Sequence, residues 1–157
     1  MPCPAPIRFL VLCVLLAACA GRAVEDVPAD LYPGETPAMR ALIREYAGVH
    51  GIPEALLHRV IQRESDYRAG ARNGPYYGLM QILPETARTM GFRGRPSELL
   101  DAETNLMWAG RYLRGAWIVA DGDIDEAVMW YARGYYYEAR DRCLLVATGL
   151  RDRELRC

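Results

Sequence analysis

The sequence contains no lysine and only two histidines among its 157 residues. All 19 basic residues are therefore arginines, which remain charged at any physiological pH. With 20 acidic residues the net charge is −1, which creates no overall field that would attract nucleic acid or anionic lipid. Neither a glycine-rich phosphate loop nor a basic nucleic-acid-binding face is evident. His50 and His58 stand apart without a cluster of other ligands, so we predict no metal site and no cofactor.

A hydrophobic run long enough to cross a bilayer is also missing. The longest apolar run, Phe9–Ala20, has twelve residues, whereas a spanning helix needs roughly 20. It follows Arg8 and ends in small residues, which is typical of a secretory signal. We therefore predict a signal peptide at residues 1–18, a linker at 19–36 and one domain at 37–157.

Two cleavage sites are compatible with this signal. Leu16-Ala17-Ala18-Cys19 resembles a bacterial lipobox, which implies cleavage before Cys19 and a lipid on that residue. Ala18-Cys19-Ala20 instead fits cleavage after Ala20 and release of a soluble protein. We favour the lipoprotein-type signal. The expected location is the bacterial cell envelope, in the periplasm, with the lipid on Cys19 holding the protein on a membrane.

The remaining cysteines bear on the folded part. The chain has five cysteines, and Cys3 and Cys13 leave with the signal under either cleavage. Cys143 and Cys157 are the only thiols in the predicted domain, and a secreted chain meets oxidising conditions. We therefore predict a disulfide between them. Because Cys157 is the last residue, the bond would pin a tail that otherwise frays.

Caps and apolar spacing divide the predicted domain into helices. Thr36-Pro37 opens the first helix, and Gly48 is expected to end it. Asp101 and Asp123 are good N-caps for two later helices. No segment predicts a strand convincingly, so the fold class is all-α. Its helices begin near residues 37, 53, 84, 102 and 123, with one more short helix in the tail after residue 135.

Glu64 interrupts the apolar stripe of the second predicted helix. It lies seven residues after Leu57 and therefore on the same face as Leu57, Val60 and Ile61. One interpretation is an acid at a helix end that turns toward water. In the other, burial and the negative end of the helix dipole both raise the pKa of its carboxyl. A carboxylic acid that is still protonated near neutral pH can donate its proton to a leaving oxygen.

The segments after Glu64 carry a resemblance to a known family. An apolar turn holding the amide of Gln81 is followed by a proline-started helix. Together the segments resemble the soluble lytic transglycosylase family of bacterial cell-wall enzymes, with its goose-type lysozyme-like domain, over about residues 38–135. The matching residues form four ordered blocks: Glu64-Ser65 with Tyr67; Gly78-Leu79-Met80-Gln81-Ile82 with Pro84, Thr86 and Ala87; Asp101, Asn105, Gly110, Tyr112 and Leu113; and Tyr131 with Gly134.

The resemblance implies an all-α, lysozyme-like single domain that acts on peptidoglycan glycan strands without a cofactor. Glu64 would be the general acid and then the base that cleaves the β-1,4 bond between N-acetylmuramic acid and N-acetylglucosamine, leaving a 1,6-anhydromuramic product. Asn73, Met80 and Gln81 would bind substrate. Tyr131 would either reach the catalytic acid with its hydroxyl or serve as a core aromatic.

The sequence departs from the family pattern in ways that keep alternatives open. Ala132 stands where the family has an asparagine that helps to hold glycan, and Ala69 replaces a proline. No second acid is evident, because Asp66 would face away from Glu64 and Asp101 is explained as an N-cap. The alternatives are a hydrolysing lysozyme-type muramidase and a non-catalytic peptidoglycan-binding module of the envelope. The sequence does not identify an envelope or secretion machine that the protein serves.

Overall fold

The computed structural model describes residues 30–155 and 157. The predicted signal peptide at residues 1–18, Cys19 and the first part of the predicted linker lie outside the described residues. The described part is dominated by helices, which confirms the all-α class. Its elements are α1 (Pro37–His50), α2 (Glu54–Glu64), β1 (Arg72–Asn73), β2 (Tyr76–Tyr77), α3 (Pro84–Thr89), the 3₁₀ helix η1 (Pro96–Leu100), α4 (Ala102–Val119), α5 (Ile124–Arg133) and α6 (Tyr136–Asp141).

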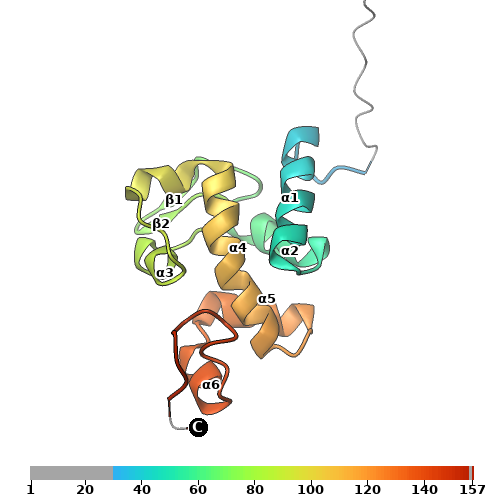
Figure 1. Cartoon of the computed structure of the whole chain (residues 1–157). Coiled ribbons are helices and arrows are strands. Elements are labelled where there is room, and N and C mark those ends of the chain that lie inside the picture. The colour runs from blue at the N-terminus through green and yellow to red at the C-terminus, as the bar shows by residue number, and fades with distance from the viewer. Residues whose placement is uncertain (1–29, 156) are drawn as a thin grey trace, which may run out of the picture.

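The long helix α4 organises the molecule (Figure 1). It runs through the middle and contacts α1, α3, α5 and η1. α1 and α2 lie on one side of it, while the β1–β2 hairpin and α3 lie on the other. α5 packs against both α4 and α2, and α6 with the C-terminal tail forms one end of the molecule.

Three helices begin at the side-chain caps that the sequence predicts. Thr36 accepts a hydrogen bond from the Met39 N–H, as Asp101 and Asp123 do from the N–H groups three residues further on. The predicted end of α1 at Gly48 is wrong. The helix continues to His50, and Gly51 is the residue that adopts the left-handed conformation, with φ +62°.

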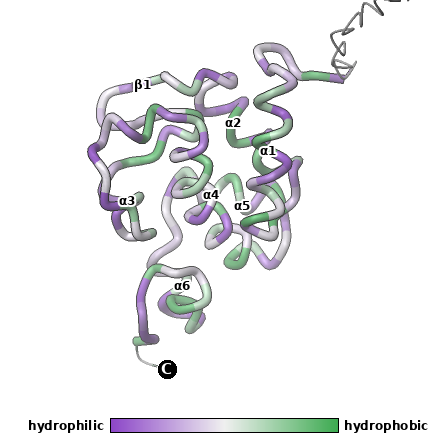
Figure 2. The backbone as a smooth tube through the Cα atoms, turned by 45° about the horizontal axis from the view of Figure 1, so that its top comes forward, coloured by the Kyte–Doolittle hydropathy of each residue, from purple (hydrophilic) through white to green (hydrophobic). Residues whose placement is uncertain are grey.

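Apolar residues from all the longer helices meet in one core. Ile43, Leu57, Ile61, Leu106 and Leu113 are fully buried. Figure 2 shows hydrophobic and hydrophilic residues alternating along the helices, as expected for helices with one face on a core. No helix among the described residues is long and apolar enough to cross a membrane.

A small antiparallel hairpin stands where the sequence predicts only a loop. Arg72 pairs with Tyr77 and Asn73 with Tyr76, across a tight connection in which Gly74 has φ +56°. Strands of two residues are too short to display an alternating apolar pattern, which explains why the sequence did not predict them. The hairpin forms one wall of the site described below.

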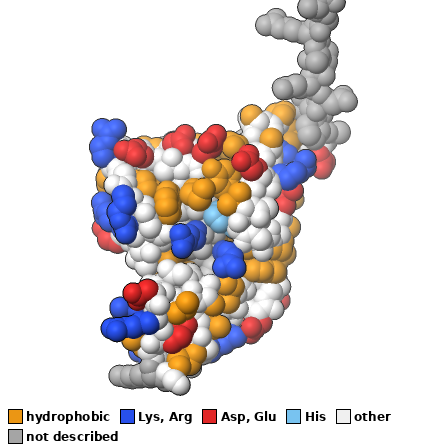
Figure 3. All heavy atoms as spheres, viewed as in Figure 1, with side chains coloured by type: hydrophobic (Ala, Val, Ile, Leu, Met, Phe, Trp, Pro, Cys, Tyr) orange, Lys and Arg blue, Asp and Glu red, His pale blue; other side chains and the backbone are white. Residues whose placement is uncertain are grey.

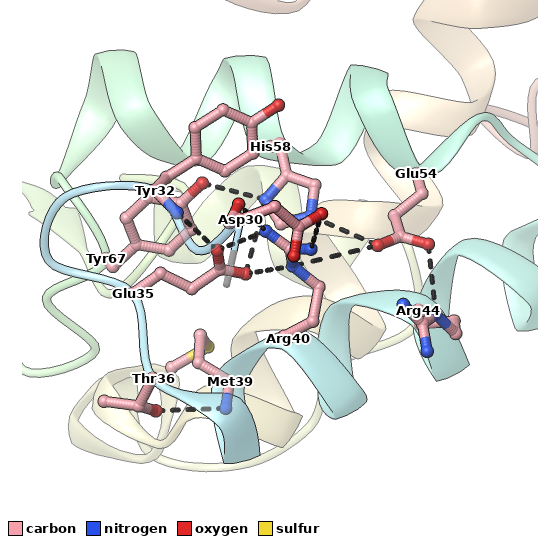
Figure 4. Close-up of polar contacts among 10 residues, drawn as sticks. All are labelled: Asp30, Tyr32, Glu35, Thr36, Met39, Arg40, Arg44, Glu54, His58 and Tyr67. Atoms are coloured by element: carbon pink, nitrogen blue, oxygen red, sulfur yellow. Dashed lines mark hydrogen bonds and ion pairs between the residues drawn. The ribbon is translucent and has the colours of Figure 1, made fainter. Parts of the chain in front are cut away.

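Residues 30–36, which the sequence assigns to the linker, pack against α1 and α2 (Figure 4). The Glu35 side chain is buried and accepts hydrogen bonds from Arg40 Nε at 2.6 Å and Arg40 Nη2 at 2.7 Å. The Tyr32 N–H donates to the same carboxylate at 3.0 Å, and the Tyr32 ring lies 5.0 Å from the His58 ring. The packed unit therefore includes residues before Pro37.

A disulfide joins Cys143 and Cys157 and ties the end of the chain to the loop after α6. Their Cα atoms are 6.0 Å apart. The Glu154 carboxylate accepts hydrogen bonds from the N–H groups of Leu145 and Val146, at 3.0 and 2.7 Å. The tail thus has both a covalent and a hydrogen-bonded attachment to the rest of the domain.

Candidate active site

A groove of about 530 Å³ opens where the ends of α2 and α5 approach the hairpin. Most of its wall is aromatic or polar, and the turn between β2 and α3 closes one side. The residues that line it are Arg63, Glu64, Asn73, Tyr76, Gln81, Ile82, Leu83, Thr86, Tyr112, Tyr131, Ala132, Arg133 and Gly134.

Glu64, the last residue of α2, faces this groove with only 24% of its side chain exposed. Burial raises the pKa of its carboxyl above the ordinary value of 4.5, and the Arg63 guanidinium offsets only part of that increase. The C-terminal end of the helix dipole acts in the same direction as burial. The structure therefore favours the interpretation of Glu64 as a half-buried acid over that of a solvated helix end.

Ser65 fixes the end of α2 against the turn that follows the hairpin. Its hydroxyl is buried and donates to the Leu79 carbonyl at 2.7 Å. Asp66 and Tyr67 then take left-handed conformations, with φ +52° and +61°, and lead the chain away from the helix axis. The position of the Glu64 carboxyl is thus set by the turn as well as by the helix.

The turn itself is held by Asn105, a fully buried amide on α4. Its Nδ2 donates to the carbonyls of Tyr77 and Leu99, both at 2.8 Å, and its Oδ1 accepts from the Met80 N–H at 2.9 Å. Gly78 is required here, because a Cβ would lie 2.2 Å from Asn105 Nδ2. The sequence predicts no role for Asn105, although an amide on the apolar face of a helix is a signal for one.

Tyr131 and Met80 are joined by a hydrogen bond that the sequence did not predict. The Tyr131 hydroxyl donates to the Met80 carbonyl at 2.8 Å. The Tyr131 ring is buried and also lines the groove, so it serves the core and the site together. Burial raises the pKa of Tyr131 far above its ordinary value, and the nearby charge of Glu64 adds to this effect. The Met80 side chain is fully buried and does not line the groove, because the turn points it into the core.

Gln81 and Asn73 do reach the groove. Gln81 has φ +47°, and its Nε2 donates to the carbonyls of Ala71 and Gly78, at 3.1 and 2.8 Å. Both amide hydrogens are therefore used by the backbone, and the side-chain oxygen remains to accept from a ligand. Asn73 lies on β1 and is exposed among the residues that line the groove.

Tyr112, which matches the family pattern but for which the sequence predicts no role, supplies an aromatic wall of the groove. Its ring stacks on Tyr135, with 4.7 Å between ring centroids, and meets the edge of Tyr131 at 5.5 Å. Burial raises the pKa of Tyr112 to about 12. The hydroxyl is therefore neutral at physiological pH and can donate to or accept from a sugar.

Glu64 is the only acidic residue among the described residues that line the groove. Asp66 is exposed and outside the lining, and Asp101 caps α4 as predicted. The part of the chain that the structure describes contains no cluster of side chains that could hold a metal ion. What the groove offers chemically is one carboxyl that exchanges a proton, beside neutral hydrogen-bonding groups, aromatic rings and the guanidinium groups of Arg63 and Arg133.

A helical domain with a single half-buried glutamate in an aromatic-walled groove is of the lysozyme-like class. The family model of the Transglycosylase SLT domain matches residues 41–141, well over half of the chain. The chain belongs to this family, and membership supports transglycosylase activity on peptidoglycan. No solved structure matches the chain significantly.

Proposed function

We propose that the protein is a peptidoglycan lytic transglycosylase that cleaves the β-1,4 bond between N-acetylmuramic acid and N-acetylglucosamine. The observation that carries this proposal is the position of Glu64. It is the sole acid among the described residues lining the groove, and burial raises the pKa of its carboxyl. A retaining or inverting two-carboxylate mechanism would need a second acid across the bond.

The reaction runs in two proton transfers through Glu64. First, the protonated carboxyl donates its proton to the glycosidic oxygen, the bond from that oxygen to C1 of the muramic residue breaks, and N-acetylglucosamine leaves with a free hydroxyl. The resulting Glu64 carboxylate then takes the proton of the muramic 6-hydroxyl. Its oxygen bonds to C1, which forms the 1,6-anhydro ring and returns Glu64 to its protonated state.

The neighbouring residues bind and position. Tyr112 and Tyr76 present aromatic surfaces on two sides of the groove, and the Gln81 side-chain oxygen accepts from a sugar hydroxyl. Tyr131 acts through the Met80 carbonyl, because their hydrogen bond ties α5 to the turn beside Glu64. This arrangement leaves the proton of Glu64 as the one available for transfer.

Mass analysis of the products from purified sacculi tests the proposal. Digestion should release muropeptides with 1,6-anhydromuramic ends, which are lighter by one water than reducing ends. Reducing muramic ends would identify a hydrolysing muramidase that keeps Glu64 as acid but uses water in the second step. Binding to sacculi without release of any fragment would identify a non-catalytic module.

We further propose that the protein works in the periplasm, held on a membrane by a lipid on Cys19. Support comes from the Leu16–Cys19 stretch that ends the short apolar run. One acyl chain binds a membrane only marginally, so a stable anchor needs more than one. Growth with labelled palmitate should mark the wild type and leave Cys19→Ala unlabelled. An unlabelled wild type whose mature form begins at Gly21 would contradict this location.

A further inference from the structure

A second cavity, of about 380 Å³, adjoins the groove and is lined by residues of α2 and α5. Arg63, Ala132 and Arg133 line both cavities, so the two spaces meet at these residues. Ala132 presents only a methyl group at this junction. A bound glycan strand in the groove therefore has a route along which a substituent can extend past Ala132.

The junction is rich in arginine, although the protein as a whole is slightly acidic. Figure 3 shows basic and acidic side chains interspersed over the face that it displays, with neither sign covering it. The second cavity, in contrast, is lined by three arginines and one acid, Asp125. Arg59 forms an ion pair with Asp125, which leaves the charges of Arg63 and Arg133 uncompensated by that acid.

Arg133 is held in an orientation that leaves its hydrogen-bonding edge open. Its guanidinium carbon lies 3.8 Å from the centroid of the Trp130 ring, so the indole covers one face of the cation. Arg133 forms no ion pair with any described residue. Stacking uses the face of a guanidinium, and its N–H donors point outward in the plane, where a carboxylate binds.

Arg63 is also available to an incoming anion. Its one charged contact in the described part of the chain is with Glu64, where Nε and Oε1 are 3.7 Å apart, longer than a hydrogen bond. Its side chain is 55% exposed at the edge of both cavities. When Glu64 is protonated, this contact no longer neutralises the arginine.

We propose that Arg63 and Arg133 form a carboxylate site that selects the acidic substituents of a peptidoglycan strand over a neutral glycan. This inference rests on the proposed function, which supplies the substrate class. Two groups of that substrate carry carboxylates: the lactyl group of an unsubstituted muramic residue, and the peptide stem, which converts the lactyl carboxyl into an amide and brings carboxylates of its own. A polymer of N-acetylglucosamine carries neither.

Such a site also acts on the catalytic acid. A carboxylate bound at Arg63 adds a negative charge close to Glu64 and cancels the effect by which Arg63 lowers the pKa of Glu64. Both changes favour the protonated form that the reaction needs. Substrate recognition and retention of the proton are thereby linked through one arginine.

Affinity measurements on the Glu64→Gln protein test the site without turnover. Three ligands of equal glycan length are compared: neutral N-acetylglucosamine oligomers, amidase-treated peptidoglycan strands with free lactyl groups, and strands that retain their stems. Each ligand is titrated into the Glu64→Gln protein at low and high salt. The titrations are repeated with proteins that carry Arg63→Gln, Arg133→Gln or Asp125→Asn as a second substitution. Arg44→Gln is the matched control, since Arg44 is an exposed arginine on α1 that lines neither cavity.

We expect acidic strands to bind more tightly than neutral oligomers, with an advantage that shrinks at high salt. Arg63→Gln and Arg133→Gln should each weaken the binding of acidic strands roughly tenfold, the usual loss for a charge-assisted hydrogen bond. The affinity for neutral oligomers should stay unchanged. Asp125→Asn should strengthen the binding of acidic strands, and Arg44→Gln should leave the affinity for all three ligands unchanged. Tight binding of the lactyl strands assigns the lactyl carboxylate, whereas tight binding of stem-bearing strands alone assigns the stem.

Equal affinity for all three ligands, or a loss on Arg133→Gln that is the same for neutral and acidic glycans, would overturn the carboxylate site. Failure of the proposed function would look different, because the wild type would then release no fragments from sacculi. The two results come from separate measurements, one on binding and the other on products.

Discussion

At the scale of single residues, the catalytic assignment depends on where α2 ends. Val60 and Ile61, one turn before Glu64, are sealed in the core, and Asp66, two residues after it, is exposed. Glu64 lies between these environments, buried enough to raise the pKa of its carboxyl and open enough to meet a substrate. Its place on an apolar stripe provides the burial, and its place at a helix terminus provides the access to substrate.

Ala132 replaces an asparagine that the family resemblance leads one to expect. The residue is exposed at the junction of the two cavities, with no side chain beyond its methyl group. Ala132→Asn should tighten the binding of neutral N-acetylglucosamine oligomers by about 1 kcal/mol, the contribution of one hydrogen bond. Titration in the Glu64→Gln background measures this. No change, or weaker binding, would show that the groove has been rebuilt around alanine.

The Tyr131 hydroxyl gives a second residue-scale prediction. Tyr131→Phe leaves the Met80 carbonyl without its partner in a buried position, which should lower the free energy of unfolding by about 1–3 kcal/mol. Turnover should also fall, because the turn beside Glu64 is then held less firmly. Denaturant unfolding measures the first effect. Tyr137→Phe is the control, since Tyr137 is 70% exposed; equal stability of the two variants would contradict the assigned role.

The sequence predicted some of the site residues and not others for a physical reason. Glu64 stands out as a candidate in the sequence because a carboxylate breaks an apolar repeat, which is visible within one helix. Met80 was misplaced because a motif within a turn does not reveal which side chains point into the core. The role of Asn105 could not be predicted, because its three hydrogen bonds go to residues that lie 6 to 28 positions away along the chain and approach it only in the folded protein.

At the scale of elements, local signals predicted where helices begin. The caps at Thr36, Asp101 and Asp123 each contact a backbone group three residues away, so they are readable from the sequence. The hairpin and the packing of residues 30–36 were not predicted. Two-residue strands carry no period, and the Glu35 carboxylate and Arg40 form an ion pair only because α1 turns the arginine back toward the segment before it.

The ion pair between Glu35 and Arg40 fastens this N-terminal segment and predicts an effect on stability. The Arg40 side chain is only 9% exposed and that of Glu35 is fully buried. Glu35→Ala would leave a buried guanidinium without its main partner, which costs about 3–5 kcal/mol for pairs of this kind. Denaturant unfolding at pH 7 should show a loss of this size. A loss below about 1 kcal/mol would place the pair among weak surface contacts.

The same pair predicts a dependence of stability on pH. Burial alone would raise the pKa of Glu35, but hydrogen bonds from Arg40 and the Tyr32 N–H outweigh it and bring the pKa below the ordinary value of 4.5. The stabilisation is therefore complete above pH 4.5 and is lost as the pH falls through the lower, folded-state pKa. The stability gap between wild type and Glu35→Gln should shrink from pH 7 to pH 3. Glu85→Gln, on the exposed face of α3, should show no such gap.

At the scale of the whole molecule, a disulfide closes a loop of the chain after α6. The sequence separation of Cys143 and Cys157 is 14, and closing a loop of this size contributes about 3 kcal/mol of stability. A digest of unreduced protein should contain the two cysteines in one cross-linked peptide, and reduction should lower the unfolding midpoint. Two separate peptides with free thiols would contradict the bond.

The central claim is that the proton of Glu64 performs the cleavage, and replacing Glu64 with glutamine tests it most directly. Glutamine keeps the size and hydrogen-bonding capacity but has no transferable proton. Glu64→Gln should be as stable as the wild type or more so, because it no longer buries a carboxyl that tends to ionise.

The decisive measurement is the rate at which wild type and Glu64→Gln release fragments from purified sacculi, with binding to the same sacculi measured in parallel. We predict that Glu64→Gln binds as the wild type does and loses the general-acid contribution, on the order of 10²–10⁴-fold in rate. Full activity in Glu64→Gln would contradict the account and remove Glu64 from the chemistry.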